Sequence, residues 1–321
     1  MRRVVLLLAL PLALAAQAPG SQPTLSTEQL INARRFDEAK SAVDALLAKD
    51  TNDPAAMYLM GRLVHAQGNS SLAVDWFEKA LKRDERNAQY HTWLGNALGD
   101  EAQKAGKLRQ PFLARRVKSE FERAVELDPK SIDAREGLVG FYSIAPGIMG
   151  GSMEKAREQA TEVAKLNPIR GHLQLGRVAE REKNPAAAEA EYKVLLTTHP
   201  DSTIGYYALA NFYRTQSRWD DAFGTYEQLM KLKPDELNVH LTYAGTAAQS
   251  GKNLERGERE AKTYLEGAKD APPASVSNAH WRLGQIYEKT ARKDLARAEY
   301  NASIKLNPQN QNAKKSLRGL E

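Results

Sequence analysis

The chain of 321 residues contains no cysteine, 27% charged residues of mixed sign and a formal net charge of +6. Without cysteine, the protein cannot form disulfides, a zinc–cysteine site, a thiol nucleophile or a lipid anchor on a cysteine. The positive charge is too mild to indicate a nucleic-acid partner. Arg2 and Arg3 lie in a segment that we expect to be removed, which leaves 6 − 2 = +4.

The first 18 residues have the layout of a secretory signal peptide. A basic start precedes an apolar run from Val4 to Ala16, and Ala16-Gln17-Ala18 provides small residues for cleavage. The alternative is an uncleaved anchor helix, but the run is short for a membrane span of about 20 residues and Pro11 interrupts it. We expect a signal peptide over 1–18, a disordered lead-in over 19–24, no transmembrane segment in the mature chain, and a location in the periplasm of a Gram-negative bacterium.

Residues 203–234 show the pattern that organises the remaining chain. Tyr206, Leu209 and Tyr213 lie on one face of a first helix, and Tyr226 lies on the apolar face of a second helix that ends before Pro234. Small residues on both faces allow the two helices to approach closely. Because such a pair leaves one face of each helix unburied, it needs further pairs beside it.

The same pattern recurs along the chain from residue 25. We expect a degenerate first unit over 25–49, regular units from 54 onwards, an irregular seventh unit whose second helix lies near 254–265, a regular eighth unit, and a polar capping helix over 310–320. Two insertions interrupt the spacing. The one near 103–112 should place a loop between two lengthened helices, and the one near 143–152, SIAPGIMGGS, should form a structured loop.

These pairs resemble the tetratricopeptide repeat, with the pattern W-x2-L-G-x2-Y…A-x3-F…P over 34 residues. The resemblance covers about residues 25–320. It implies an all-α, right-handed α-solenoid of antiparallel helix pairs, with about seven or eight units and a C-terminal cap. The first helix of each pair would line the concave surface. The insertions, with APGIMGG in the second, resemble those of a group of secreted bacterial repeat proteins, some of which sit beside solute transporters.

The sequence gives no sign of catalytic or metal chemistry. Four of the six histidines lie four residues before the small residue of a first helix, so one repeat position explains His91, His172, His240 and His280. As metal ligands they would sit on separate repeats, which favours packing over a metal site. Nucleophile elbows, zinc motifs and phosphate loops are absent from the sequence. We expect no catalytic residue, no metal and no cofactor.

The resemblance implies that exposed positions of the first helices bind an extended peptide. Arginine forks pair bidentately with carboxylates, so we expect a protein or peptide partner that is acidic or carboxylate-bearing. Asn211 stands where carboxylate-clamp members of the family keep an asparagine, whereas Tyr207 replaces their lysine. The alternative is that the arginines are simply solvated. The candidate groove residues are Arg170, Arg177, Arg181, Tyr207, Asn211, Arg214, Trp281 and Gln285.

Three functions remain open. The leading hypothesis is a non-catalytic secreted scaffold that binds a partner segment in its concave groove. The alternative is a solute-binding or transporter-accessory protein, in which the insertions close the groove around a small anionic ligand. A third is an enzyme of cell-wall polysaccharides, or an assembly factor for one, and the missing catalytic motifs argue against the enzyme itself.

Overall fold

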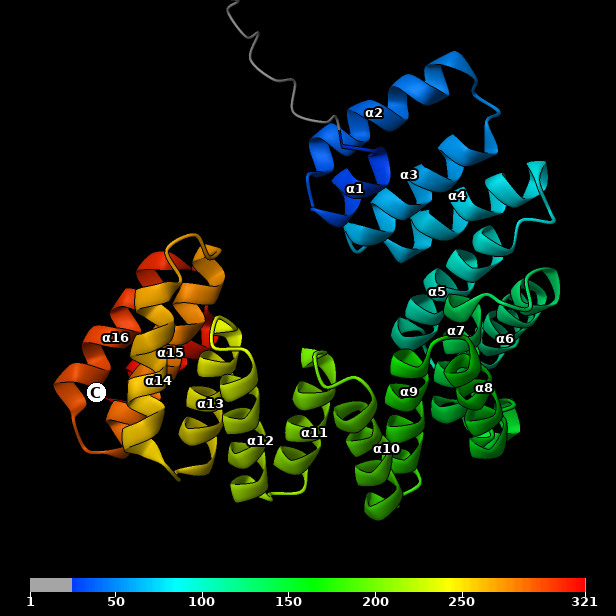
Figure 1. Ribbon diagram of the computed structural model, residues 1–321. Helices are drawn as coiled ribbons and strands as arrows, with labels where there is room; N and C mark the ends of the chain where they lie inside the picture. Colours follow the sequence, from blue (N-terminus) through cyan, green and yellow to red (C-terminus); the bar gives the residue numbers. More distant parts are fainter. Residues whose placement is uncertain (1–24, 321) are drawn as a thin grey trace, which may run out of the picture. The chain divides into compact units, whose positions relative to one another are not determined.

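The computed structural model describes residues 25–320, and every regular element within this range is helical (Figure 1). The range contains seventeen α-helices, one short 3-10 helix and no strand. This confirms the expected all-α solenoid of helix pairs. The signal peptide expected over 1–18 and the lead-in expected over 19–24 lie outside the described residues.

The chain falls into two compact units, one ending at Leu127 and the other beginning at Asp128. The first unit holds three helix pairs, which are α1 Thr27–Asn32 with α2 Phe36–Lys49, α3 Pro54–Ala66 with α4 Ser70–Arg83, and α5 Ala88–Lys104 with α6 Gln110–Leu127. The repeat spacing predicts one solenoid over 25–321.

The second unit holds five helix pairs and a final single helix. Its elements are α7 Ile132–Ile144, η1 Gly147–Met149, α8 Met153–Leu166, α9 Pro168–Arg181, α10 Pro185–Thr198, α11 Thr203–Thr215, α12 Trp219–Leu232, α13 Leu237–Ser250, α14 Leu254–Gly267, α15 Pro273–Lys289, α16 Lys293–Leu306 and α17 Gln311–Arg318.

A glycine in the first helix and an aromatic ring in the second set the close approach within several pairs. A Cβ atom on Gly61 would lie 2.6 Å from Cε1 of Phe77, a distance at which atoms overlap. The same relation holds for Gly95 with Phe121, Gly176 with Tyr192, and Gly284 with Tyr300. The ring therefore fills the space that a side chain on the first helix would otherwise occupy.

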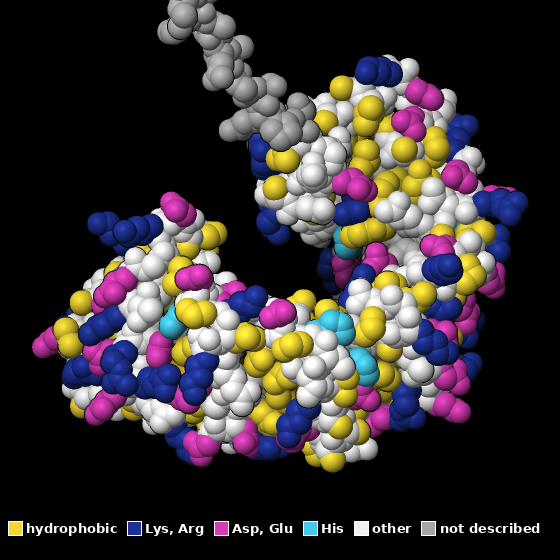
Figure 2. Space-filling model, viewed as in Figure 1, with side chains coloured by type: hydrophobic (Ala, Val, Ile, Leu, Met, Phe, Trp, Pro, Cys, Tyr) yellow, Lys and Arg dark blue, Asp and Glu magenta, His cyan; other side chains and the backbone are white. Residues whose placement is uncertain are grey.

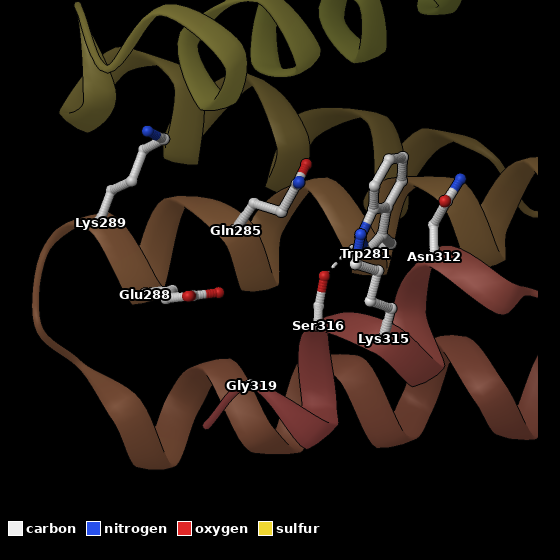
Figure 3. Close-up of a pocket in the computed structure, with 8 residues that line it drawn as sticks. All are labelled: Trp281, Gln285, Glu288, Lys289, Asn312, Lys315, Ser316 and Gly319. Carbon is white, nitrogen blue, oxygen red and sulfur yellow. Dashed lines mark hydrogen bonds between the residues drawn. The ribbon is translucent and has the colours of Figure 1, made fainter. Parts of the chain in front are cut away.

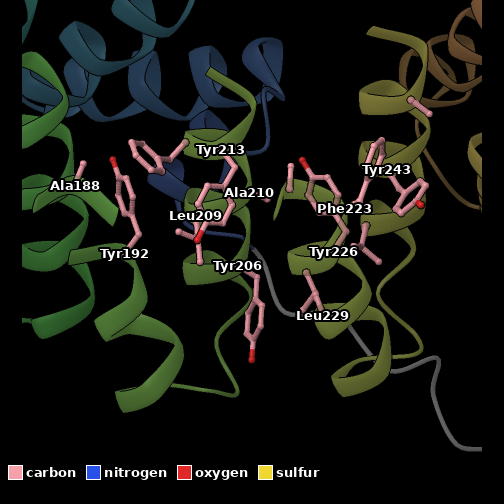
Figure 4. Close-up of a cluster of buried hydrophobic side chains, with 14 of the residues drawn as sticks. Ala188, Tyr192, Tyr206, Leu209, Ala210, Tyr213, Phe223, Tyr226, Leu229 and Tyr243 are labelled. Atoms are coloured by element: carbon pink, nitrogen blue, oxygen red, sulfur yellow. The ribbon is translucent and has the colours of Figure 1, made fainter. Parts of the chain in front are cut away.

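Buried side chains continue from one pair to the next, as the cluster between α10 and α13 shows (Figure 4). Tyr192 of α10, Leu209 of α11, Tyr226 of α12 and Tyr243 of α13 all belong to this cluster. The rings of Phe223 and Tyr243 lie 4.7 Å apart between centroids. Each pair thus buries the face that it could not bury alone, which is how a repeat array is stabilised.

The two insertions take different forms. α5 and α6 extend to 17 and 18 residues, and residues 105–109 connect them. After α7 the chain turns through η1, and Gly150 adopts a φ of 97°. The Ser152 amide donates to the Tyr142 carbonyl at 2.8 Å, which closes this second loop onto the end of α7.

Candidate interaction surface

The candidate residues lie on the first helices of the second unit, and surface charge alone does not separate them from their surroundings. Figure 2 shows basic and acidic side chains interspersed over the face in view. What distinguishes a cation on such a surface is whether a carboxylate of the protein already neutralises it.

Arg170 of α9 is held by the protein's own carboxylates. Its Nε donates to Glu136 Oε1 of α7 at 2.9 Å, and its Nη2 donates to Asp133 Oδ1 at 2.5 Å. The hydrogen bond to Glu136 and the pairing with Asp133 raise the pKa of Arg170 above its ordinary value, against the opposing effect of burial. Arg170 therefore links α9 to α7. Because two carboxylates already neutralise its charge, it is poorly suited to bind an anionic partner.

The other candidates on α9 and α11 divide into free and engaged side chains. Arg177, Arg181 and Asn211 are exposed and form no hydrogen bond or ion pair with another residue in the described range. Tyr207 is half-buried, and its hydroxyl donates to Glu236 Oε1 at 3.2 Å. Burial, aided by the Glu236 charge, raises the pKa of Tyr207, so the hydroxyl stays protonated. The structure thus gives Tyr207 a packing role that the resemblance did not predict.

Arg214, in the last turn of α11, reaches across to α13. Its Nη2 donates to Gln249 Oε1 at 2.8 Å. Its Nε is buried and has no hydrogen-bond partner among the described residues. No carboxylate of this range forms an ion pair with Arg214, so its positive charge is not paired.

Arg282 of α15, which was not predicted from the sequence, approaches the same face of α13. A Cβ atom on Gly245 would lie 3.4 Å from Arg282 Nε, so the missing side chain makes room for the guanidinium. The Cζ of Arg282 lies 4.0 Å from the centre of the Trp281 ring, and its Nη1 donates to Gln285 Oε1 at 3.1 Å. Burial lowers the pKa of Arg282, and the nearby charge of Arg214 lowers it further.

The two guanidinium groups are therefore neighbours. Arg214 bonds to the side chain of residue 249 of α13, and Arg282 lies over residue 245, four positions earlier. These positions are one helical turn apart, roughly 6 Å, on one face. Both lack a carboxylate partner within the described chain. We call Arg214 and Arg282 the arginine pair. Two like charges that are half-buried side by side form a favourable site for an anion.

Three other arginines of the second unit have a structural role, because each stacks on a tyrosine and pairs with a glutamate. Arg218 stacks on Tyr213 and pairs with Glu189 of the preceding helix pair. The same arrangement recurs in Arg256 with Tyr243 and Glu227, and in Arg292 with Tyr287 and Glu258. Each of these cations is neutralised by a glutamate, which the arginine pair is not.

The four repeat-position histidines each contact a glutamate of the second helix in their own pair. The Nδ1 to Oε2 distances are between 2.5 and 2.7 Å. The pairs are His91 with Glu120, His172 with Glu191, His240 with Glu260, and His280 with Glu299. Within residues 25–320, no group of three or more such side chains is placed to hold a metal ion.

A hollow of about 460 Å³ lies beside the arginine pair, between α15 and α17 (Figure 3). Trp281 forms one side, and its Nε1 donates to Ser316 Oγ at 3.2 Å. Polar and charged side chains of both signs complete the lining, namely Gln285, Glu288, Lys289, Asn312, Lys315 and Ser316, together with Gly319. Trp281 and Gln285, both predicted from the sequence, thus border the hollow and the arginine pair. None of the helices in the described part of the chain has the length and apolar character of a membrane span.

Comparison with known proteins identifies the repeats. The sequence profiles of the tetratricopeptide repeat match at residues 29–91, 206–239 and 277–310. The chain therefore contains tetratricopeptide repeats, in both units. A curated relative is the DnaJ homolog subfamily C member 7 homolog of Dictyostelium discoideum, which is 20% identical over 277 residues. This match covers 86% of the chain but 45% of that relative, so the chain spans less than half of its length.

Solved structures show the same fold. Yeast Tom70 matches with a TM-score of 0.66 and 16% identity, covering 91% of this chain and 60% of Tom70. A tetratricopeptide repeat protein from Parabacteroides merdae matches with a TM-score of 0.51 and 14% identity, covering 83% and 98% of the two chains. The human IFIT1 dimer with m7Gppp-AAAA gives 0.51 and 17%, covering 92% and 71%. At these identities the likeness concerns the fold alone, since one repeat fold supports many functions.

Proposed function

We propose that this tetratricopeptide repeat protein is a non-catalytic interaction scaffold, and that the first helices of its second unit bind an acidic, carboxylate-bearing segment of a partner protein. The observation that carries the proposal is the arginine pair. Arg214 of α11 and Arg282 of α15 lie against positions of α13 that are one helical turn apart, and neither has a carboxylate partner in the described chain.

The energetics favour an anion at this place. A half-buried guanidinium loses hydration, and a neighbouring like charge adds repulsion, so both effects are relieved when a carboxylate binds. Arginine presents parallel donors that match a carboxylate, and Arg214 Nε is a donor without a partner. Trp281 beside Arg282 adds a large ring of the type that dominates binding energies at interfaces.

A second candidate function is the binding of a small anionic solute, as in a transporter-accessory protein. The hollow between α15 and α17 supports it, because its volume of about 460 Å³ is in the range of small-ligand sites. The lining contains Lys289 and Lys315 as well as Trp281, while the Glu288 carboxylate in the same lining opposes an anion. Both functions use neighbouring parts of one surface, so the experiment must separate them.

The test compares the wild type with Arg214→Gln/Arg282→Gln, which removes both charges and keeps polar side chains. The matched control is Arg259→Gln/Arg297→Gln, which removes two exposed arginines from the second helices α14 and α16. Binding is measured by fluorescence polarisation with a labelled peptide rich in Asp and Glu, and with its Asn and Gln counterpart. Partners captured from a cell extract are identified by mass spectrometry.

We expect the acidic peptide to bind the wild type and the control, and the arginine-pair variant to bind about tenfold more weakly or worse, as expected when a charged hydrogen-bonded contact is lost. Equal binding to all three proteins would refute the proposal. If no peptide binds but small carboxylates raise the melting temperature of the wild type alone, the solute-binding function replaces it.

The proposal includes export of the protein through residues 1–18 into a Gram-negative periplasm. Its support is the order of basic, apolar and small residues in that segment. Mass spectrometry of the protein recovered from the periplasm tests this, because cleavage after Ala18 would give a chain that begins at Pro19. Recovery of the uncut chain from the membrane fraction would contradict it.

A further inference from the structure

The positive charge of this chain is concentrated in one segment. Residues 102–119 contain six basic residues and no acidic one, namely Lys104, Lys107, Arg109, Arg115, Arg116 and Lys118. The formal net charge of the whole chain is +6, so all other residues together sum to 6 − 6 = 0. This segment covers the end of α5, the connection that follows it, and the first half of α6 in Figure 1.

Three of these six basic side chains bond to other residues of the protein. Lys104 Nζ donates to Ser70 Oγ at 2.7 Å, Arg116 pairs with Glu78 at 2.6 Å, and Lys118 pairs with Glu122 at 3.5 Å. Lys107, Arg109 and Arg115 are exposed and contact no acidic group in the described chain. Their charges are therefore available to something outside the molecule.

Two large apolar side chains project between these free cations. Leu108 is 98% exposed and Phe112 is 64% exposed, whereas the next apolar residues of α6, Leu113 and Val117, are buried. Leu108 thus lies outside the core, and most of the Phe112 surface faces solvent. We call Lys107, Leu108, Arg109, Phe112 and Arg115 the basic tip.

The other insertion provides a useful contrast. Ile144 and Ile148 are 61% and 95% exposed, so apolar exposure is common to both insertions. Residues 143–152, however, contain no charged residue. Only the first insertion joins exposed apolar side chains to unpaired positive charges.

We propose that the basic tip docks this protein on the surface of an anionic phospholipid bilayer. Leu108 and Phe112 enter the boundary between headgroups and acyl chains, while Lys107, Arg109 and Arg115 contact the lipid phosphates. Projecting apolar side chains ringed by cations suit such an interface, because burial of the apolar groups and attraction to anionic lipid act together. A nucleic acid would use the cations but would gain little from an exposed leucine.

The test is cosedimentation of the folded full chain with phosphatidylcholine vesicles, with and without phosphatidylglycerol. We expect binding to the anionic vesicles, little binding to the neutral ones, and release as the salt concentration rises. Each basic side chain should contribute about fivefold to the partition coefficient. Phe112→Trp should show a blue shift of its fluorescence on anionic vesicles, which reports entry of the ring into the boundary region.

Two variants separate the parts of the proposal. Leu108→Ser/Phe112→Ser keeps every charge and should bind about tenfold more weakly or worse, and Lys107→Gln/Arg109→Gln should lose binding to anionic vesicles. The matched control is Ile144→Ser/Ile148→Ser, which should bind like the wild type. Because the substituted side chains are exposed, circular dichroism should be unchanged in all three.

Failure of the wild type to bind anionic vesicles overturns the proposal. So does full binding by Leu108→Ser/Phe112→Ser, because the interaction would then be charge alone, as for a nucleic acid or any polyanion. The arginine-pair peptide experiment does not involve these residues, so the two proposals stand or fall separately.

Discussion

The ring of Tyr300 occupies the space where a side chain of Gly284 would be, since a Cβ atom on Gly284 would lie 2.5 Å from Cε1 of the tyrosine. The two residues face each other across the α15–α16 pair, and Tyr300 is fully buried. Its hydroxyl donates to Glu288 Oε2 at 2.6 Å, one turn after Gly284. The ring is thus held by its attachment to α16 and by the hydrogen bond of its hydroxyl, so it cannot easily move to make room for a side chain at position 284.

Gly284→Ala should therefore destabilise the protein by about 1–3 kcal/mol, the usual cost of overpacking a core. The control is Gly224→Ala on α12, where an added Cβ atom meets nothing within 4 Å. That change should stabilise by about 0.5–1 kcal/mol, because alanine favours the helix. Urea unfolding of both variants measures the difference. A neutral effect of Gly284→Ala would contradict this account of the helix approach.

The helix pairs could be predicted from the sequence because small and aromatic residues recur at fixed spacing, as at Gly284 and Tyr300. The histidines were correctly assigned to a repeat position, but their glutamate partners were missed. The sequence does contain a signal for these partners, since Glu120 directly precedes Phe121 and Glu299 directly precedes Tyr300. A prediction based on the spacing of apolar residues does not consider the polar residues beside them.

The candidate surface could be predicted only in part. The helix that carries each candidate follows from local periodicity, so Trp281 and Gln285 were placed correctly on a first helix. The partners of long side chains do not follow from it, because a guanidinium reaches residues far away in the sequence. Arg170 contacts Glu136, 34 positions earlier, and Arg214 contacts Gln249, 35 positions later. Arg282 was missed because its role depends on the space above Gly245.

The pair of His91 and Glu120 should make stability depend on pH. Burial alone would lower the pKa of His91, but hydrogen bonds to Glu120 and to the Glu85 carbonyl outweigh it and raise the pKa above 6.5, with Arg123 opposing. Because the folded-state pKa is raised, the stabilisation is fully present below about 6.5 and is lost as the pH rises through the folded-state pKa.

The measurement is urea unfolding of the wild type and His91→Gln at pH 6 and pH 8.5. We expect the wild type to be more stable by about 1 kcal/mol at the lower pH and by much less at the higher one. Glu120→Gln should show the same loss of pH dependence. An advantage of equal size at both pH values would exclude a charged His91 from the pair.

Glu189 should produce the opposite dependence in the acid range. The hydrogen bond from Arg218, supported by Lys193 and Tyr213, lowers the pKa of Glu189 to about 2, although partial burial opposes this. A lowered folded-state pKa stabilises the protein above the unfolded value of about 4.5, and the contribution disappears as the pH falls towards 2.

We therefore expect the wild type to exceed Glu189→Gln in stability by roughly 1 kcal/mol at pH 6, with the difference shrinking steadily below pH 4.5. Thermal unfolding at a series of pH values measures it. Glu255→Gln, an exposed change on α14, serves as the control and should show no such trend. A constant difference down to pH 3 would mean that the Arg218–Glu189 pair does not persist in solution.

Asn310 joins the last helix to the pair beneath it. Its side-chain amide donates to Ser277 Oγ at 3.1 Å and to Ser303 Oγ at 3.0 Å, and both serines are fully buried. Its carbonyl oxygen accepts from the Ala313 amide at 3.1 Å, which caps α17. The two serine hydroxyls also bond to each other, and Ser277 Oγ donates to the Ser303 carbonyl at 2.9 Å, so Asn310 adds a third partner to a buried polar cluster and caps a helix as well.

Asn310→Ala should remove both functions and destabilise the protein by about 2–3 kcal/mol, because a helix cap and the partner of a buried polar pair are lost at once. Asn69→Ala on α4 is the matched control. Among residues 25–320 the Asn69 side chain accepts only from the Leu72 amide, so its loss should cost about 1 kcal/mol. Hydrogen exchange locates the effect, since the amides of α17 should exchange faster in Asn310→Ala while those of α4 do not. If the two alanine variants lose equal stability, the hydrogen bonds between Ser277 and Ser303 are enough for the buried hydroxyls, and the junction at α17 does not depend on Asn310.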